Sequence, residues 1–170
     1  VDVDVNTLNM SIIDLKKKIS NKTKAILAVH ILGNSTNMTE LQKISKKFNL
    51  QIIEDTCESL GSKFKNKSLG TFGRFGTFSF YVSHQITSGE GGMIVCNDKK
   101  DYEILHSLRA HGWDRGLNKK NNKNFNFINS GFNLRPMDFT ASIGLSQLKK
   151  LNKFKKNRSE NRNKIIKKLI

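Results

Sequence analysis

Apolar positions in the first third of the chain form two dense blocks separated by an amphipathic stretch. Residues 24–31 are a nearly continuous apolar run, and residues 50–53 are a shorter one. Such runs are typical of parallel strands that are covered on both faces. The intervening residues 38–48 show helical spacing, with Leu41 and Phe48 on one side. Strand, helix and strand at these lengths predict an α/β fold with a parallel sheet.

The pattern predicts further elements on both sides of this unit. Residues 1–5 favour a strand, and Ser11 with Asp14 matches a capping box that opens a helix through Ile19. Glycines punctuate residues 61–76, which predicts a short hairpin-like stretch. The remaining expected elements are a β-prone run at 77–82, a turn at 88–92, a strand at 93–96, a helix at 98–111, a polar loop at 116–130, and two helices after Pro136 and Leu151.

The helices of the second half carry apolar residues at helical spacing. In residues 98–111 these positions predict one buried face, and Pro136 suits the first position of the next helix. The apolar residues concerned are Tyr102, Leu105, Leu108, Phe139, Ile143, Leu145, Leu151, Phe154, Ile165 and Leu169.

A net charge of +16, from 30 basic and 14 acidic residues, raises the question of nucleic-acid binding. The excess is concentrated at one end, because residues 149–168 hold ten basic residues and one acid. Lysine greatly outnumbers arginine, and no basic patch is interleaved with aromatic residues as in single-strand binders. We interpret the charge as a solvated helix face and expect no nucleic-acid partner.

Other compositional features favour a cytoplasmic protein. No apolar run approaches the length needed to cross a bilayer, and residues 1–5 resemble neither a signal peptide nor a transit peptide. Cys57 and Cys96 have no metal-like spacing and no disulfide framework, as expected of free thiols in a reducing compartment. We therefore expect no membrane association and no metal site. The chain also lacks an initiator methionine and opens in an expected strand, so we expect a fragment.

Three places along the chain could carry chemistry. Asp55 follows a buried strand, and open α/β sheets bind ligands at the carboxyl ends of their strands, although a solvated acid in a turn is an equally good interpretation. Residues 78–84 with glycines at 89–92 could hold a phosphate through hydroxyl and N–H groups. Turns also require glycine, and a lone His84 is more often structural. Residues 131–135 place a polar pair in a loop before a helix, where a surface loop is the default.

Together, the order and spacing of these segments resemble the DegT/DnrJ/EryC1/StrS family of pyridoxal-phosphate (PLP)-dependent sugar aminotransferases and dehydratases. The similarity covers essentially the whole chain. The matching motifs are Asp2-Val-Asp4, Lys22-Thr-Lys-Ala-Ile26, Val29-His30 with Gly33, Glu54-Asp55 with Leu60-Gly61, Gly70-Thr-Phe-Gly73, Ser79-Phe80, Gly89-Glu-Gly-Gly92, and Gly131-Phe-Asn-Leu-Arg135 with Ala141 and Gly144 to Leu148.

The resemblance implies a type I PLP-dependent aminotransferase fold, in which a mostly parallel seven-stranded sheet carries helices on both faces. Residues 1–150 would form the central part of its large domain, and residues 151–170 a helix leading toward a missing C-terminal small domain. The upstream phosphate-binding loop would be missing as well. The resemblance also implies a homodimer with a shared active site.

The same resemblance implies roles for individual residues. Asp55 would bind the pyridine nitrogen of the cofactor and keep it protonated, so that the ring can absorb carbanion electrons. Ser79 would contact the cofactor phosphate, and Asn133 would reach that phosphate from the partner subunit. Glu58 would contact the cofactor ring, and Arg135 would bind substrate.

One position departs from the family pattern. Five residues after Ser79 the resemblance places a lysine that bonds covalently to the cofactor, whereas this chain has His84. An imidazole forms no stable covalent link to the cofactor aldehyde, but it can transfer protons near neutral pH. A histidine there resembles the family's 3-dehydratases, which hold pyridoxamine phosphate (PMP) non-covalently. In the implied reaction, His84 takes a proton from C4′ of the cofactor and the C3 hydroxyl of a nucleotide-linked 4-keto-6-deoxyhexose leaves as water.

The family's 3-dehydratases form two branches. One holds an iron–sulfur cluster on cysteines between the segments that match Arg109 and Asn133, and residues 110–132 contain no cysteine. The other branch acts on GDP-4-keto-6-deoxy-D-mannose in deoxysugar and lipopolysaccharide O-antigen biosynthesis, with glutamate as amino donor. Residues 108–115 look like that branch, so the resemblance implies this substrate and this donor.

Two alternatives stay open at the level of sequence. The chain could belong to a PLP-dependent nucleotide-sugar aminotransferase whose lysine is lost or displaced, which would yield a 4-amino sugar. It could also belong to a catalytically dead or regulatory family member, in which His84 marks an inactive site. The identity of the product distinguishes the first alternative from 3-dehydration. Failure of the purified protein to retain any B6 vitamer would favour the second alternative.

Overall fold

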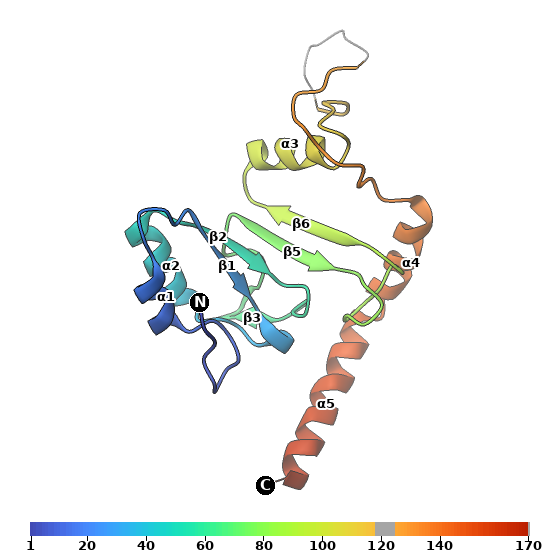
Figure 1. The fold of residues 1–170 in the computed structure, drawn as a ribbon. Helices are drawn as coiled ribbons and strands as arrows, with labels where there is room; N and C mark the ends of the chain where they lie inside the picture. Colours follow the sequence, from blue (N-terminus) through green and yellow to red (C-terminus); the bar gives the residue numbers. More distant parts are fainter. Residues whose placement is uncertain (118–124, 170) are drawn as a thin grey trace.

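The computed structural model describes residues 1–117 and 125–169, and its centre is a mostly parallel four-stranded sheet (Figure 1). The strand order is β1-β2-β5-β6; β1, β2 and β5 run parallel, and β6 runs antiparallel to β5. The strands of the sheet are β1 (Ala25–Val29), β2 (Gln51–Asp55), β5 (Phe75–Ser79) and β6 (Gly92–Cys96).

Helices precede, connect and follow these strands, close to the ranges that the sequence predicts. They are α1 (Ile12–Lys18), α2 (Met38–Phe48), α3 (Lys99–Leu108), α4 (Asp138–Leu148) and α5 (Leu151–Leu169). A 3₁₀ turn η1 (Ile31–Gly33) follows β1, and a small hairpin of β3 (Lys63–Phe64) and β4 (Lys67–Ser68) lies between β2 and β5. None of the described helices combines the length and apolarity needed to span a membrane.

Side-chain caps explain where the two N-terminal helices begin. The hydroxyl of Ser11 accepts a hydrogen bond from the backbone N–H of Asp14 (3.3 Å), as the capping box predicts. The carboxylate of Asp14 bonds to the N–H of Asp2 (2.7 Å) instead of returning to Ser11. In α2, Asn37 accepts from the N–H of Glu40, and the helix ends at the left-handed residue Asn49.

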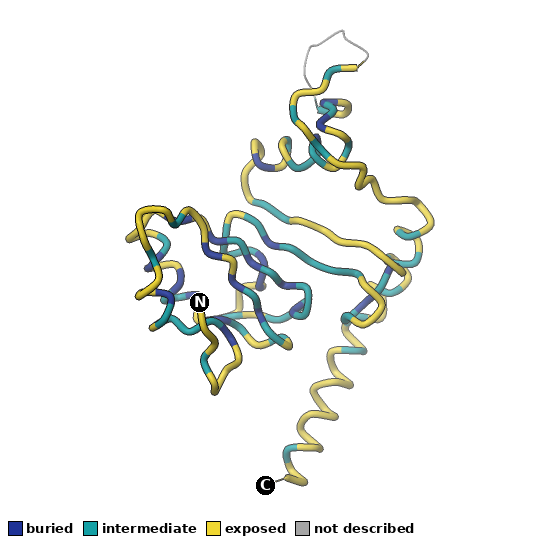
Figure 2. Tube along the Cα trace, in the orientation of Figure 1, coloured by how far each residue is buried: buried dark blue, intermediate teal, exposed yellow. Residues whose placement is uncertain are grey.

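The hydrophobic core lies between α1, α2 and one face of the sheet. Figure 2 shows most of the buried residues in this part of the chain, whereas α5 is exposed along most of its length. The helices contribute apolar residues at helical spacing, and the strands contribute every second residue. The core consists of Leu15, Ile26, Ala28, Met38, Leu41, Ile44, Leu50, Ile52 and Leu69.

The opposite face of the sheet is largely open, so the expectation of strands covered on both faces is wrong for this chain. Leu27 is 55% exposed, although its neighbours Ile26 and Ala28 are buried. Ile94 on β6 is half-exposed as well. A nearly continuous apolar run therefore does not establish that both faces are covered here.

The expected strand at residues 1–5 is also wrong. These residues are irregular apart from one isolated bridge between Val3 and Met10, and a turn begins at Val5. The carboxylate of Asp4 accepts a hydrogen bond from the backbone N–H of Asn6 (3.1 Å). An aspartate that bonds to the backbone two residues ahead favours a turn over a strand.

The second half departs from the expected burial. In α3 the buried residues are Asp101 and Ser107, and Tyr102 is exposed, because Asp101 faces the guanidinium of Arg74. α4 has no buried residue, and Phe139 is 73% exposed.

Two further expectations concern the loops of this half. Pro136 lies before α4 rather than at its first position, since Met137 is the N-cap. Part of the expected loop at 116–130, namely 118–124, lies outside the described residues.

Candidate active site

Polar side chains form a short row on the open face of the sheet. Asp55 ends β2 and pairs with Thr77 of β5, and Ser79 follows two residues later. Because side chains alternate between faces along a strand, these three residues share the open face. All three are half-buried, and they lie at the carboxyl ends of parallel strands, where open α/β sheets bind ligands.

The Asp55 carboxylate is held by the turn that follows it. Its Oδ1 accepts a hydrogen bond from the N–H of Cys57 (3.0 Å), and the backbone carbonyl of Asp55 accepts from the N–H of His30 (3.0 Å). Burial raises the pKa of the Cys57 thiol to about 11, and the neighbouring Asp55 carboxylate adds to that rise. The thiol is therefore protonated at neutral pH and adds no charge beside Asp55.

A turn after β5 brings Ser79 and His84 into one segment. The Ser79 hydroxyl accepts from the N–H of Tyr81 (3.2 Å), and the N–H of His84 donates to the carbonyl of Tyr81 (3.1 Å). The rings of Tyr81 and His84 meet edge to face, with centroids 6.1 Å apart. His84 is half-buried and lines a cavity of about 300 Å³.

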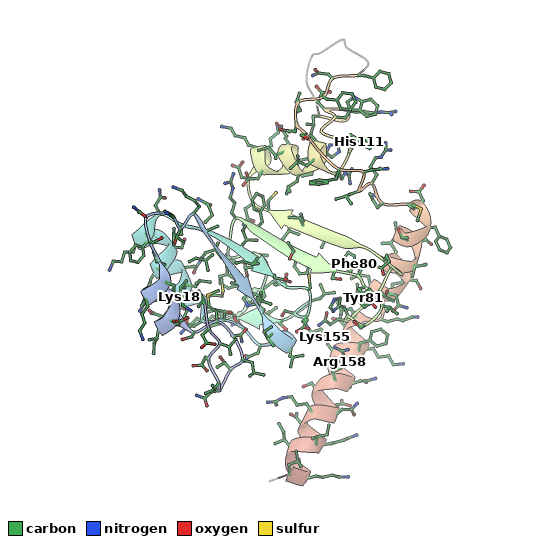
Figure 3. The ribbon with its side chains drawn as sticks, in the orientation of Figure 1. Lys18, Phe80, Tyr81, His111, Lys155 and Arg158 are labelled. Carbon is green, nitrogen blue, oxygen red and sulfur yellow. The ribbon has the colours of Figure 1, made fainter. Side chains whose placement is uncertain are left out.

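The other wall of this cavity comes from α5. Phe154 and Arg158 line it, and Figure 3 shows Lys155 and Arg158 on α5 beside the end of β5, near the labelled Phe80 and Tyr81. The Nζ atom of Lys155 donates to the backbone carbonyl of Gly61 (2.9 Å). The basic helix is thus tied to the loop beyond β2, so part of its charge lies beside the candidate site.

Glu58 lies next to the Asp55 turn, with its carboxylate engaged by the backbone. Its Oε2 accepts from the N–H of Leu32 (2.8 Å), and its backbone carbonyl accepts from the side-chain amide of Gln85. Gln85 follows His84 directly. The structure therefore brings Asp55, Glu58 and the His84 turn into one neighbourhood.

Asn133 and Arg135 lie elsewhere. Asn133 is exposed and forms an isolated bridge with Ala110 at the end of α3, and Arg135 is exposed. Figure 3 places His111, the neighbour of Ala110, far from Phe80 and Tyr81. Within one chain, then, these two residues are not brought together with Asp55 and Ser79.

Sequence reasoning assigned no role to a buried pair directly beneath this site. His30 and Glu54 are fully buried, with Nε2 of His30 3.1 Å from Oε2 of Glu54. The sequence contained a signal for it: Glu54 lies two residues after the core residue Ile52 on a strand, so it points into the core. An acid there requires a partner.

A family model described as the DegT/DnrJ/EryC1/StrS aminotransferase family matches residues 1–169. The chain is 46% identical over 165 residues to GDP-4-keto-6-deoxy-D-mannose 3-dehydratase of Escherichia coli O55:H7, covering 91% of this chain and 42% of that protein. It is 42% identical over 154 residues to GDP-perosamine synthase of Escherichia coli O157:H7, covering 91% and 41%. The chain therefore spans about two fifths of the length of these curated relatives.

Solved structures give the same picture. The structure of E. coli GDP-4-keto-6-deoxy-D-mannose-3-dehydratase with bound hydrated PLP has a TM-score of 0.90 at 45% identity, covering 96% of this chain and 45% of that chain. GDP-4-keto-6-deoxymannose-3-dehydratase with a trapped PLP-glutamate geminal diamine has a TM-score of 0.82 at 45% identity, covering 89% and 42%. These likenesses confirm the PLP-dependent aminotransferase fold that the sequence predicts, of which this chain is a part.

Proposed function

Because the chain belongs to the DegT/DnrJ/EryC1/StrS aminotransferase family, we propose that its protein removes the C3 hydroxyl of a nucleotide-linked 4-keto-6-deoxyhexose. The substrate is GDP-4-keto-6-deoxy-D-mannose, the cofactor is PMP, and glutamate is the amino donor. The observation that carries this proposal is His84 in the turn after Ser79, at the position where the family pattern has a lysine.

The open-face residues fit a cofactor of this kind. Asp55 presents an ionisable carboxylate at a strand end, as a protonated ring nitrogen requires, and Ser79 presents a hydroxyl to a phosphate group. When bound, PMP supplies an amine that reacts with the substrate ketone and a ring that accepts electrons. Asp55 would keep the ring nitrogen protonated, and Ser79 would donate a hydrogen bond to the phosphate.

His84 would be the proton carrier of the reaction. Its imidazole would take a proton from C4′ of the cofactor, since a side chain that cannot tether the cofactor covalently is free for acid–base work. The turn that anchors the His84 backbone N–H on Tyr81 would hold the ring beside Ser79, and hence near the cofactor. Dehydration then needs no lysine at this position.

We also propose that two copies of the chain share each site. α4 carries apolar residues with none of them buried, and a helix of this kind normally packs against another surface. Asn133, expected at the cofactor phosphate, lies far from Ser79 of its own chain, which favours a contribution from the partner subunit. A mixture of Asn133→Ala and His84→Asn proteins tests this: we expect heterodimers with one intact site, and no regained activity would contradict a shared site.

Product identification tests the proposed reaction. The intact protein is incubated with PLP, glutamate and GDP-4-keto-6-deoxy-D-mannose, and the nucleotide sugars are separated and analysed by mass spectrometry. We expect a product that has lost the C3 hydroxyl, together with 2-oxoglutarate formed from glutamate. A product that carries nitrogen at C4 would refute dehydration.

An aminotransferase is the second candidate, and a specific observation favours it. The chain is 42% identical to a GDP-perosamine synthase, nearly as similar as it is to the 3-dehydratase at 46%. Overall similarity therefore separates the two activities poorly, and the residue at position 84 has to decide between them. A 4-amino product in the assay above would establish this second candidate.

A further inference from the structure

The pair of His30 and Glu54 is the most deeply buried ionisable cluster among the described residues, and the reaction proposed above does not use it. Both side chains are 0% exposed. His30 directly follows β1, and Glu54 belongs to β2, one residue before Asp55. A buried carboxylate is costly unless hydrogen bonds replace water, so its surroundings show what holds it there.

Four donors surround the Glu54 carboxylate. Its Oε1 accepts from the N–H groups of Phe72 (2.6 Å) and Gly73 (2.7 Å), and its Oε2 accepts from the N–H of Gly70 (2.8 Å) and from Nε2 of His30. Burial alone would raise the pKa of Glu54, but these hydrogen bonds outweigh it and hold the pKa below its ordinary value. The carboxylate is ionised, and both oxygens are fully engaged.

The tautomer of His30 follows from its other contact. Its Nδ1 lies 3.2 Å from the backbone N–H of Thr36, and a ring nitrogen that accepts a hydrogen bond carries no proton. The proton of a neutral His30 is therefore on Nε2, where it is donated to Glu54. The imidazole is therefore held on both sides, since it accepts a hydrogen bond from Thr36 at Nδ1 and donates one to Glu54 from Nε2.

Glycines allow the turn at 70–73 to approach β2 closely enough for these bonds. A Cβ atom on Gly73 would lie 2.4 Å from the carbonyl oxygen of Ile52, which is shorter than any real contact of that kind. Gly70 has a positive φ of 85°, which favours glycine. The sequence thus builds a close-fitting turn whose N–H groups converge on one carboxylate.

We propose that His30 and Glu54 are positioning residues that hold the end of β2 so that the Asp55 carboxylate points to the open face. Consecutive strand residues point to opposite faces, so anchoring Glu54 in the core directs Asp55 outward. The N–H of His30 donates to the carbonyl of Asp55 (3.0 Å), and the hydroxyl of Ser59 donates to the carbonyl of His30. That the Asp55 carboxylate meets a cofactor on this face rests on the proposed function.

Glu54→Gln in the intact protein tests the positioning role. A glutamine must turn its NH₂ group toward one of the two donor pairs, because both oxygens of Glu54 accept twice. We expect the dissociation constant of PLP to rise about tenfold or more, at a temperature where parent and variant are both folded. Glu40→Gln is the matched control, since it makes the same change in an exposed ion pair with Lys43; we expect unchanged PLP binding.

Two readouts do not depend on the cofactor. The N–H of Cys57 donates to the Asp55 carboxylate, so its amide hydrogen exchange, followed by NMR, reports the position of that carboxylate. We expect faster exchange at Cys57 in Glu54→Gln. Nitrogen chemical shifts of His30 in the cofactor-free protein should show the Nε2–H tautomer, and the other tautomer would overturn the assignment.

The outcomes separate this inference from the proposed function. If Glu54→Gln unfolds more easily but binds PLP within twofold of the parent and keeps the exchange rate of Cys57, the pair is structural only and the positioning role is wrong. If the parent binds no PLP at all, the proposed function fails, and the exchange of Cys57 alone then decides whether Glu54 positions Asp55.

Discussion

The two faces of the central sheet differ in how their side chains are surrounded: one face is packed against helices, and the other is open. On the packed face, Ile26 and Ile52 meet α1 and α2, and even the ionised Glu54 is enclosed by donors. On the open face, Asp55 and Ser79 stand among half-buried residues. Stability is therefore concentrated on one side of the sheet and the candidate chemistry on the other, only one residue apart along β2.

This difference means that changes on the two faces should have separable effects. A change near the open face should reduce activity and leave the folded state intact. A change on the packed face should lower the free energy of unfolding first. Three substitutions test this difference between the faces, and a fourth tests a residue that belongs to neither; they follow in order of decreasing expected effect.

His84→Asn should reduce 3-dehydration by about 10²–10⁴-fold, because an amide cannot exchange protons at neutral pH. Thermal unfolding should stay close to that of the parent, since the hydrogen bond described for His84 comes from its backbone, and its half-buried ring meets the ring of Tyr81. His106→Asn, on α3, is the control and should retain activity. If His84→Asn dehydrated the substrate as fast as the parent, His84 would have no part in the reaction.

Leu41→Ala should destabilise the protein by about 2–5 kcal/mol, because a fully buried leucine leaves a cavity when it is truncated. Denaturant unfolding of the intact protein gives the value. Ile13→Ala on α1, where the side chain is 71% exposed, should change stability by no more than about 0.5 kcal/mol. Equal losses for the two variants would mean that the packed face is not the core.

Ser79→Ala should weaken PLP binding about tenfold, through the loss of one hydrogen bond to a charged phosphate. Titration followed by absorbance measures the affinity. Ser83→Ala lies in the same turn, where the side chain is exposed, and should bind PLP like the parent. A larger loss for Ser83→Ala than for Ser79→Ala would reverse the assignment.

The smallest effect should come from Asp101, which belongs to neither face and ties α3 to the start of β5. Its carboxylate accepts hydrogen bonds from both Nε (2.7 Å) and Nη2 (2.6 Å) of Arg74. This guanidinium lowers the pKa of Asp101 below its ordinary value of 3.8, against a smaller opposing effect of burial.

The sign of the pH dependence follows from that lowered pKa. The stabilisation is complete above the ordinary pKa and is lost as the pH falls through the lower folded-state pKa. Asp101→Asn should therefore unfold at a lower temperature than the parent near neutral pH, and the gap should shrink below pH 3.8. A gap that is constant across this range would contradict the pair's contribution.

The sequence predicted those features that depend on local patterns. The apolar period of α2, the cap at Ser11 and the turn before β6 all appear where expected, because residues close along the chain determine them. The strand at 1–5 failed because the side chain of Asp4 competes for the backbone. The exposure of Leu27 could not be derived from its apolar run, since burial depends on what lies opposite it.

The site was predictable in part. Asp55 and Ser79 stand at strand ends as expected, and the register places them on one face. The role of Glu54 was not predictable, since its four donors come from the residue that follows β1 and from a turn 16 to 19 residues away. Such convergence depends on the fold and leaves only an acid at a core position as a sequence signal.

The central claim is that this protein holds its cofactor without a covalent bond, because position 84 is a histidine. The intact parent protein and His84→Lys are incubated with PLP, reduced with sodium borohydride, digested and mapped by mass spectrometry. We expect no lysine of the parent to carry a stoichiometric pyridoxyl label, and we expect a stoichiometric label at position 84 of the variant. A stoichiometric label on one lysine of the parent, above all on Lys155 beside Gly61, would contradict the claim.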